Sequence, residues 1–201
     1  MKVLSLAAML LCSSAAMAHY TLDYPASRGF AEDTEATAPC GGYSTVANRT
    51  EFPLSNGFLE IYSEHVNANI KINVVYGNNP AAADFTSAAA TPASSVTLSH
   101  PGKACFPLDL SSFQGAANNT NATIQIVYNG GDSALYQCAD VVLVSSAAGF
   151  NQTLCVNDGS STSTSSSTAT ATGTSNAGSA LSAKGAATAA AAVFMAAIMA
   201  F

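Results

Sequence analysis

The 201-residue chain is acidic, with 12 Asp and Glu against 6 Lys and Arg, and it contains no tryptophan. This charge disfavours binding to nucleic acid or to anionic lipid, and it suits the capture of a cation. Two terminal segments that we expect to be removed raise the hydrophobic fraction to 49%, and what remains is one domain of ordinary size.

The first 18 residues have the pattern of a secretory signal peptide. Lys2 precedes an apolar stretch, and the small residues Ala16 and Ala18 stand where signal peptidase requires them. We therefore expect cleavage after Ala18, which makes His19 the first residue of the mature chain. Cleavage after Ala16 also satisfies the small-residue rule, and it would start the chain at Met17 instead.

Residues 19–158 have the pattern of an all-β domain. Apolar and polar residues alternate from Val66 to Tyr76 and again from Ala122 to Tyr128, and a turn sequence, Asn-Gly-Gly-Asp, follows at 129–132. Further strands are expected at 20–24, 58–62, 96–98, 106–110 and 141–144. Because no segment has a helical period, the sequence predicts an antiparallel β-sandwich.

An acidic run, Glu32, Asp33 and Glu35, falls in a polar loop of this domain. We interpret it as a solvated run and not as a pair of catalytic carboxylates. The chain also lacks the GxSxG, HExxH and phosphate-binding glycine motifs.

Four cysteines remain once Cys12 leaves with the signal peptide: Cys40, Cys105, Cys138 and Cys155. An even number in a secreted chain indicates two disulfides, for which the sequence allows three pairings. We favour Cys40 with Cys138 and Cys105 with Cys155. A zinc site is the competing interpretation, but the chain has no CxxC pair and the compartment is oxidising.

Four N-glycosylation sequons indicate a glycosylated surface protein and are expected to mark loops. They begin at Asn48, Asn118, Asn121 and Asn151.

Residues 159–176 consist mostly of Ser, Thr and Ala, a composition too polar to build a packed core. We expect an extended, O-glycosylated stalk. Residues 177–201 end in an apolar run, 186–201, that is shorter than the roughly 20 residues of a transmembrane helix.

The small residues before that run fit a GPI attachment site, with Asn176 as the modified residue and Ser175 or Gly178 as alternatives. A marginal tail anchor is the competing interpretation, and a signal peptide argues against it. The expected location is the extracellular face of the plasma membrane, or the cell wall.

Three histidines remain for metal chemistry: His19, His65 and His100. If His19 is the first residue, its α-amino nitrogen and its ring Nδ1 can chelate one metal ion, and a second imidazole completes a set of three nitrogens that suits Cu(II). His65, between two expected strands, is the candidate for that imidazole, although by itself it would be interpreted as a solvated turn histidine. His100 precedes Pro101 and Gly102 in a loop signature and is expected on the surface.

The opening of the domain carries three short segments, His19 to Pro25, Arg28 to Phe30 and Pro39 to Gly42. They resemble the fungal copper-acquisition proteins related to lytic polysaccharide monooxygenases, and the resemblance extends over the whole domain, the stalk and the C-terminal tail. It implies an immunoglobulin-like or fibronectin III-like sandwich with a histidine brace, one Cu(II) per chain and no polysaccharide cleavage.

Carried over to this sequence, the resemblance places the brace on His19 and His65 and an aspartate ligand on Asp140. Without the resemblance, Asp140 would be an inward-pointing carboxylate that needs a partner. The expected function is that of a monomeric, non-enzymatic copper-binding protein that acquires copper at the cell surface and presents it to a copper importer.

Two other functions are compatible with parts of the sequence. An oxidative enzyme acting on cell-wall polysaccharide would use the same brace, but the lack of tryptophan leaves it without the aromatic platform that a flat substrate favours. A structural wall mannoprotein with an incidental N-terminal histidine would account for the stalk and the sequons.

Overall fold

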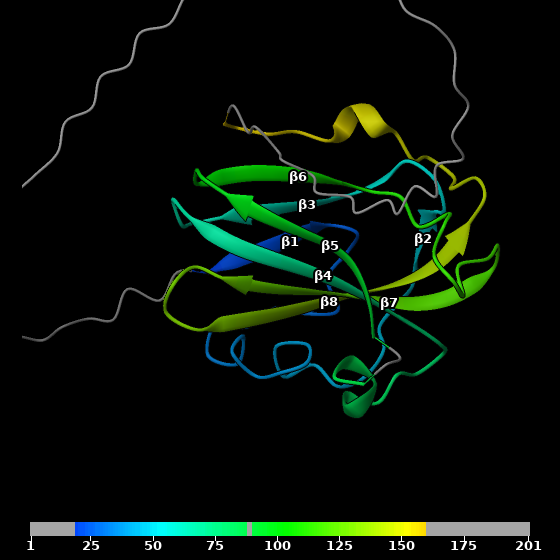
Figure 1. Ribbon diagram of the computed structural model, residues 1–201, viewed down its shortest axis with the longest axis horizontal. Helices are drawn as coiled ribbons and strands as arrows, with labels where there is room; N and C mark the ends of the chain where they lie inside the picture. Colours follow the sequence, from blue (N-terminus) through cyan, green and yellow to red (C-terminus); the bar gives the residue numbers. More distant parts are fainter. Residues whose placement is uncertain (1–18, 88–89, 160–201) are drawn as a thin grey trace, which may run out of the picture. The chain divides into compact units, whose positions relative to one another are not determined.

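The computed structural model describes residues 19–87 and 90–159, which form eight strands and two short 3₁₀-helices. In chain order these are β1 Tyr20–Tyr24, β2 Thr50–Pro53, β3 Gly57–Ser63, β4 Ala68–Tyr76, η1 Ala82–Phe85, β5 Ala90–Leu98, β6 Gly102–Leu108, β7 Thr120–Asn129, β8 Ala134–Val144 and η2 Gln152–Leu154. The strands form two layers (Figure 1).

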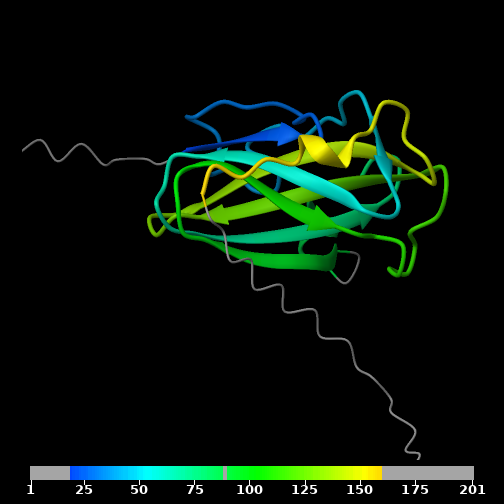
Figure 2. The same cartoon turned by 90° about the horizontal axis from the view of Figure 1, so that it is seen from above.

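One sheet has the order β1-β3-β6 and the other the order β2-β8-β7-β4-β5. Neighbouring strands are antiparallel except for β2 and β8, which run parallel. The prediction of a mostly β fold is confirmed, and its purely antiparallel character needs correction, because the unpredicted strand β2 makes the larger sheet mixed. Figure 2 shows the layers after a quarter turn.

The core lies between the sheets and follows the predicted alternation. In β4, Ile70 and Ile72 are completely buried and Lys71 between them is exposed, as expected when successive side chains point to opposite faces. The strand begins at Ala68, two residues later than predicted. Val66 lies before it and is 61% exposed. Residues from both sheets fill the core, among them Leu22, Leu59, Ile61, Phe106, Ile124, Ile126, Val141 and Leu143.

The long connection 25–49 runs beside β8. Arg28 N donates to Cys138 O at 2.7 Å, and Tyr136 N donates to Glu35 O at 2.9 Å. A disulfide joins Cys40 to Cys138, with 5.1 Å between their Cα atoms. These links hold two loop side chains, Arg28 and Glu35, against the larger sheet.

A second disulfide, Cys105 to Cys155, fastens the last described residues to β6, and the two disulfides follow the pairing favoured from the sequence. Asp158 N donates to Lys103 O at 3.0 Å, and Cys105 N donates to the side chain of Asn157 at 2.8 Å. The segment 155–158 therefore lies along β6.

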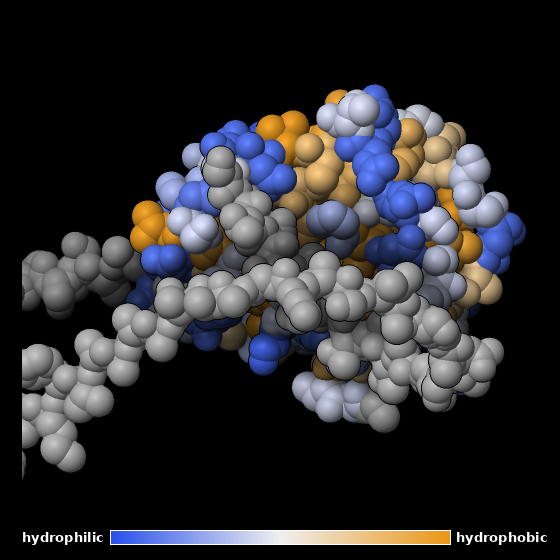
Figure 3. Space-filling view, turned by 45° about the horizontal axis from the view of Figure 1, so that its top comes forward, coloured by the Kyte–Doolittle hydropathy of each residue, from blue (hydrophilic) through white to orange (hydrophobic). Residues whose placement is uncertain are grey.

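Three sequon asparagines, Asn48, Asn118 and Asn151, are exposed and lie outside the strands, as expected. Asn121 differs, because it is half-buried and is the second residue of β7. Figure 3 shows that hydrophobic residues on one face lie among hydrophilic ones.

The expected signal peptide 1–18, the stalk from residue 160, Asn176 and the segment 177–201 lie outside the described residues and stay predictions. In the described part of the chain, no helix has the length and apolarity to cross a membrane.

Candidate metal site

Strand pairing brings His19 and His65 to the same end of the β1-β3-β6 sheet. Tyr20 pairs with Ser63, and Glu64 N donates to His19 O at 3.2 Å. His65 follows one residue later, in the connection from β3 to β4. In Figure 1 the start of β1, the β3–β4 connection and the β7–β8 turn lie at this one end of the domain.

The imidazole of His19 lies between two glutamates. Its Nδ1 is 2.9 Å from Glu35 Oε2, and its Nε2 is 3.6 Å from Glu32 Oε2. The side chain of Glu35 is 1% exposed, that of Glu32 is 68% exposed, and that of His19 is 14% exposed. Phe30 contacts the ring edge-on, at 6.5 Å between centroids.

Gln137 of β8 holds Glu35 in place. Its Nε2 donates to Glu35 Oε1 at 3.0 Å and to Tyr20 O at 2.6 Å, and its Oε1 accepts from Leu22 N at 3.1 Å. The interpretation of the acidic run as wholly solvated is therefore wrong at Glu35. The burial of Glu35 could not be predicted from the sequence, because it depends on Gln137, a partner on a distant strand.

His65 lies in a position fixed by several neighbours. Ser63 Oγ links to the backbone of His65 at 3.2 Å and to Tyr128 Oη at 2.6 Å. The centroid of the His65 ring lies 6.2 Å from that of Tyr128. The His65 ring also lies directly against Gly130, where an added Cβ would be 2.8 Å from the nearest ring atoms. The absence of a side chain at Gly130 is thus what admits the imidazole.

Two buried tyrosines stack beneath this end of the sheet. The rings of Tyr20 and Tyr128 are 4.7 Å apart and nearly parallel. Burial raises the pKa of both hydroxyls, and the nearby Glu35 carboxylate raises that of Tyr20 further. Both rings are therefore neutral packing groups at physiological pH.

Asp132 is a third group at this end that was not predicted. Its Oδ2 is 3.9 Å from His65 Nε2, and its side chain is 66% exposed. The residue belongs to the turn between β7 and β8, which the Asn-Gly-Gly-Asp sequence signalled. That signal identifies a turn, and only the packing of this turn against the β3–β4 connection brings the carboxylate to a histidine.

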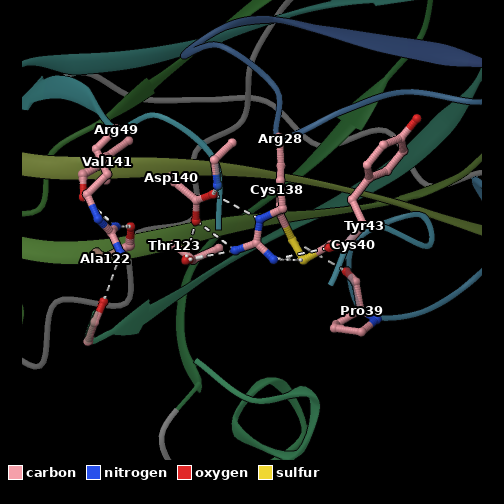
Figure 4. Close-up of polar contacts among 12 residues, drawn as sticks. Arg28, Pro39, Cys40, Tyr43, Arg49, Ala122, Thr123, Cys138, Asp140 and Val141 are labelled. Atoms are coloured by element: carbon pink, nitrogen blue, oxygen red, sulfur yellow. Dashed lines mark hydrogen bonds and ion pairs between the residues drawn. A yellow bond between two sulfur atoms is a disulfide. The ribbon is translucent and has the colours of Figure 1, made fainter. Parts of the chain in front are cut away.

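Asp140 has a different place, and the geometry does not support it as a third metal ligand. Its Oδ1 accepts from Arg28 at 2.7 Å and from Thr123 at 2.7 Å, and its Oδ2 accepts from Arg28 at 2.9 Å and from Ala47 N at 2.8 Å (Figure 4). Its side chain is 0% exposed. This is the buried, partnered carboxylate that the sequence admitted as the alternative.

The alternation of β8 separates Asp140 from the histidines. Gln137 points toward β1, so Asp140, three residues later, points to the opposite face of its sheet. Asp140 is also six residues along β8 from Ala134, about 20 Å from the turn that contacts His65. Burial alone would raise the pKa of the Asp140 carboxyl, but hydrogen bonds from Arg28, Ala47 and Thr123 outweigh it and lower the pKa.

His100 lies in the short β5–β6 connection, as expected, and its Nδ1 is 2.9 Å from Pro101 O.

Within residues 19–87 and 90–159, no three side chains of His, Cys, Asp or Glu form a ready metal-binding cluster. The donors that a histidine brace needs are fewer: two imidazoles and the nitrogen of the first residue. Both imidazoles are partly exposed, with two carboxylates beside His19 and one beside His65, and nitrogen donors of this kind suit copper.

The fold and this site define a class: a small, disulfide-linked β domain with two histidines, His19 and His65, at the end where its first strand begins. A sequence profile of the family described as "Copper acquisition factor BIM1-like" matches residues 17–160. The chain belongs to this family of BIM1-like copper acquisition factors.

Two curated relatives and one solved structure are similar to this chain. "Copper acquisition factor BIM1" of Cryptococcus neoformans var. grubii is 42% identical over 159 residues, covering 76% of this chain and 72% of that protein. A "lytic polysaccharide monooxygenase-like protein" of Emericella nidulans is 29% identical over 192 residues, covering 76% and 77%. Among solved structures, one of ScLPMO10B in complex with zinc aligns with a TM-score of 0.40 at 15% identity, covering 61% of this chain and 72% of that one.

Proposed function

We propose that the mature protein binds one Cu(II) at the end of the domain where His19 and His65 meet, and that it serves copper acquisition at the cell surface without cleaving polysaccharide. The observation that carries this proposal is the pairing of β1 with β3, which places the first residue of the expected mature chain beside His65. Membership of the copper acquisition family supports the choice of metal.

In this proposal His19 contributes its ring Nδ1 and the α-amino nitrogen that cleavage after Ala18 releases, and His65 contributes Nε2. In the precursor that nitrogen is part of a peptide bond, so removal of the signal peptide creates the site. Asp132, next to His65, replaces Asp140 as the carboxylate of the site. Its negative charge favours the doubly charged ion.

The anchor and the cellular role belong to the proposal as well. A GPI anchor on Asn176 would keep bound copper beside the plasma membrane, where an importer can receive it at high effective concentration. The expected N-glycans and the O-glycosylated stalk fit the same extracellular location, and the protein is expected to act as a monomer.

The test is a Cu(II) titration of the secreted protein followed by electron paramagnetic resonance, after mass spectrometry has established that the chain begins at His19. We expect an axial signal with nitrogen hyperfine structure at one copper per chain, lost in His65→Ala and kept in the control His100→Ala. Scattered copper signals would exclude the brace and favour a structural wall protein, and equal binding by both variants would show that His65 is not a ligand, which also excludes the brace.

Enzymatic activity is tested on the same preparation. The relatives named after lytic polysaccharide monooxygenases make reductant-dependent sugar oxidation the assay of choice. The proposal expects no copper-dependent product from cell-wall polysaccharides. Product that appears with the wild type and disappears with His65→Ala would make the protein an oxidative enzyme.

A further inference from the structure

We propose that Glu35 is the charge partner of the metal site: a buried carboxylate whose negative charge is balanced when the mature N-terminus and its Cu(II) ion bind beside it. This inference rests on the proposed function, and it assigns to a residue outside the brace the task of tuning how tightly copper is held.

The first step is the burial of Glu35 without a Lys or Arg partner among the described residues. Its side chain is 1% exposed, and its two oxygens contact His19 Nδ1 at 2.9 Å and Gln137 Nε2 at 3.0 Å. Among the described residues, the ion pairs made by Arg and Lys join Arg28 to Asp140 and Lys103 to Asp23 and Glu60, and the group that Glu35 meets is the imidazole of His19. A buried carboxylate without a permanently charged partner is costly, and this one has only the His19 imidazole beside it, so its presence calls for a cation at that residue.

The second step is the position of Glu35 relative to the new charges. It touches the ring of His19, the residue whose nitrogen becomes the chain terminus on cleavage. Both the α-amino group and a metal ion held by that residue bring positive charge to the neighbourhood of Glu35. In a partly buried site such an attraction is stronger than at the surface, because water screens it less.

The third step is that the carboxylate is held rigidly. The side chain of Gln137 donates to Glu35 and to Tyr20 O and accepts from Leu22 N. Tyr136 N donates to the backbone oxygen of Glu35. Glu35 therefore does not depend on the His19 contact for its position. For Nδ1 to bind copper, the His19 ring must turn away from Glu35, so that contact is given up and the carboxylate remains beside the metal site as a fixed negative charge.

The experiment compares Glu35→Gln with the control Glu32→Gln in the full-length secreted protein. Glu32 is also close to the His19 ring, but its side chain is 68% exposed and solvent screens its charge. The measurements are the Kd for Cu(II) by competition with a chelator of known affinity, and the thermal unfolding midpoint with and without Cu(II).

We expect Glu35→Gln to weaken Cu(II) binding by about tenfold or more, in the range of changes to groups that support metal ligands, and Glu32→Gln to weaken it less than about threefold. The copper-free Glu35→Gln protein should unfold at the same temperature as the wild type or higher, because a buried charge is removed. Its gain in unfolding temperature on adding copper should be smaller. A purely structural role predicts the reverse, a lower midpoint without copper and an unchanged Kd, and that result would overturn the proposal.

Glu35→Asp separates charge from shape, since it keeps the carboxylate and shortens the side chain. It should bind Cu(II) more tightly than Glu35→Gln, and equal weakening in both variants would overturn the proposal. If Glu35→Gln is not secreted while Glu35→Asp is, the copper-free fold itself needs the charge, which also overturns it. If His65→Ala binds copper as tightly as the wild type, the proposed function fails; if His65→Ala loses copper while Glu35→Gln keeps the wild-type Kd, only the role of Glu35 fails.

Discussion

Asp140 in β8 and Glu35 in the loop beside it are both fully buried carboxylates, and they differ in their partners. Asp140 is surrounded by a guanidinium, a hydroxyl and a backbone N–H, which together satisfy both of its oxygens. Glu35 contacts one imidazole and one amide and lies at the end of the domain where the chain begins. We infer that Asp140, which is paired with Arg28, stabilises the fold. Glu35, which lies beside His19 and has no Lys or Arg partner among the described residues, is inferred to serve the metal site.

The sharpest test of this comparison is Asp140→Asn. It leaves the buried Arg28 guanidinium without a compensating charge, and loss of one partner from a buried ion pair costs roughly 3–5 kcal/mol of folding free energy. Urea denaturation measures this loss. The Kd of copper should stay at its wild-type value, and a large loss of copper affinity at full stability would return Asp140 to the metal site.

The ion pair of Arg28 and Asp140 also predicts that stability depends on pH in the acid range. Because the folded-state pKa of Asp140 is lowered, its contribution is fully present above the unfolded-state pKa of about 3.9 and is lost as pH falls through the folded value. Wild-type stability should therefore fall in acid below about pH 4 more steeply than that of Asp140→Asn. Parallel acid-unfolding curves for the two proteins would show that the pair contributes nothing in this range.

Gly130→Ala tests the metal site by a change of shape that leaves its charge unaltered. The added methyl group would lie 2.8 Å from the His65 ring, so the imidazole must move, at a cost of about 1–3 kcal/mol. We expect Cu(II) affinity to drop on the order of tenfold, with altered nitrogen hyperfine structure in the electron paramagnetic resonance spectrum. An unchanged spectrum would mean that His65 is free to reorient or does not bind the metal.

Asp132→Asn is the counterpart of Asp140→Asn at the exposed end. Since its side chain is 66% exposed, the substitution should change unfolding free energy by less than about 0.5 kcal/mol. Copper affinity should fall about tenfold, because the carboxylate next to His65 is lost. Calorimetric titration measures the Kd for Cu(II), and urea denaturation measures the unfolding free energy. Asp132→Asn should change the Kd and spare the stability, the opposite of what is expected for Asp140→Asn.

The smallest effect is expected for Tyr128→Phe, which removes the hydroxyl that bonds to Ser63 beneath the β3–β4 connection. One such hydrogen bond contributes about 1 kcal/mol. Thermal unfolding should register this loss, and copper affinity should fall only a few-fold. An effect on copper as large as that of Gly130→Ala would mean that this bond, and not Gly130, fixes the ring of His65.

Alternation and turn residues were enough to predict much of the β structure. The polar and apolar residues of β4 alternate in the chain as they do in the fold, because each side chain's face follows from its position along the strand. Strand β2, Thr50–Pro53, escaped prediction because its sequence does not alternate between polar and apolar residues and it is held by parallel pairing with the distant β8.

Part of the candidate site could likewise be predicted from the sequence and part could not. His19 and His65 could be chosen from the sequence, because imidazoles are scarce in this chain and one of them follows an expected cleavage site. The carboxylates could not be assigned, since Asp132, Asp140 and Glu35 are ordinary acidic residues in the sequence. Their roles depend on which sheet face, turn or strand each meets. The contacts of Asp132 with His65, Glu35 with Gln137 and Asp140 with Arg28 join residues 67 to 112 positions apart, which only the tertiary structure decides.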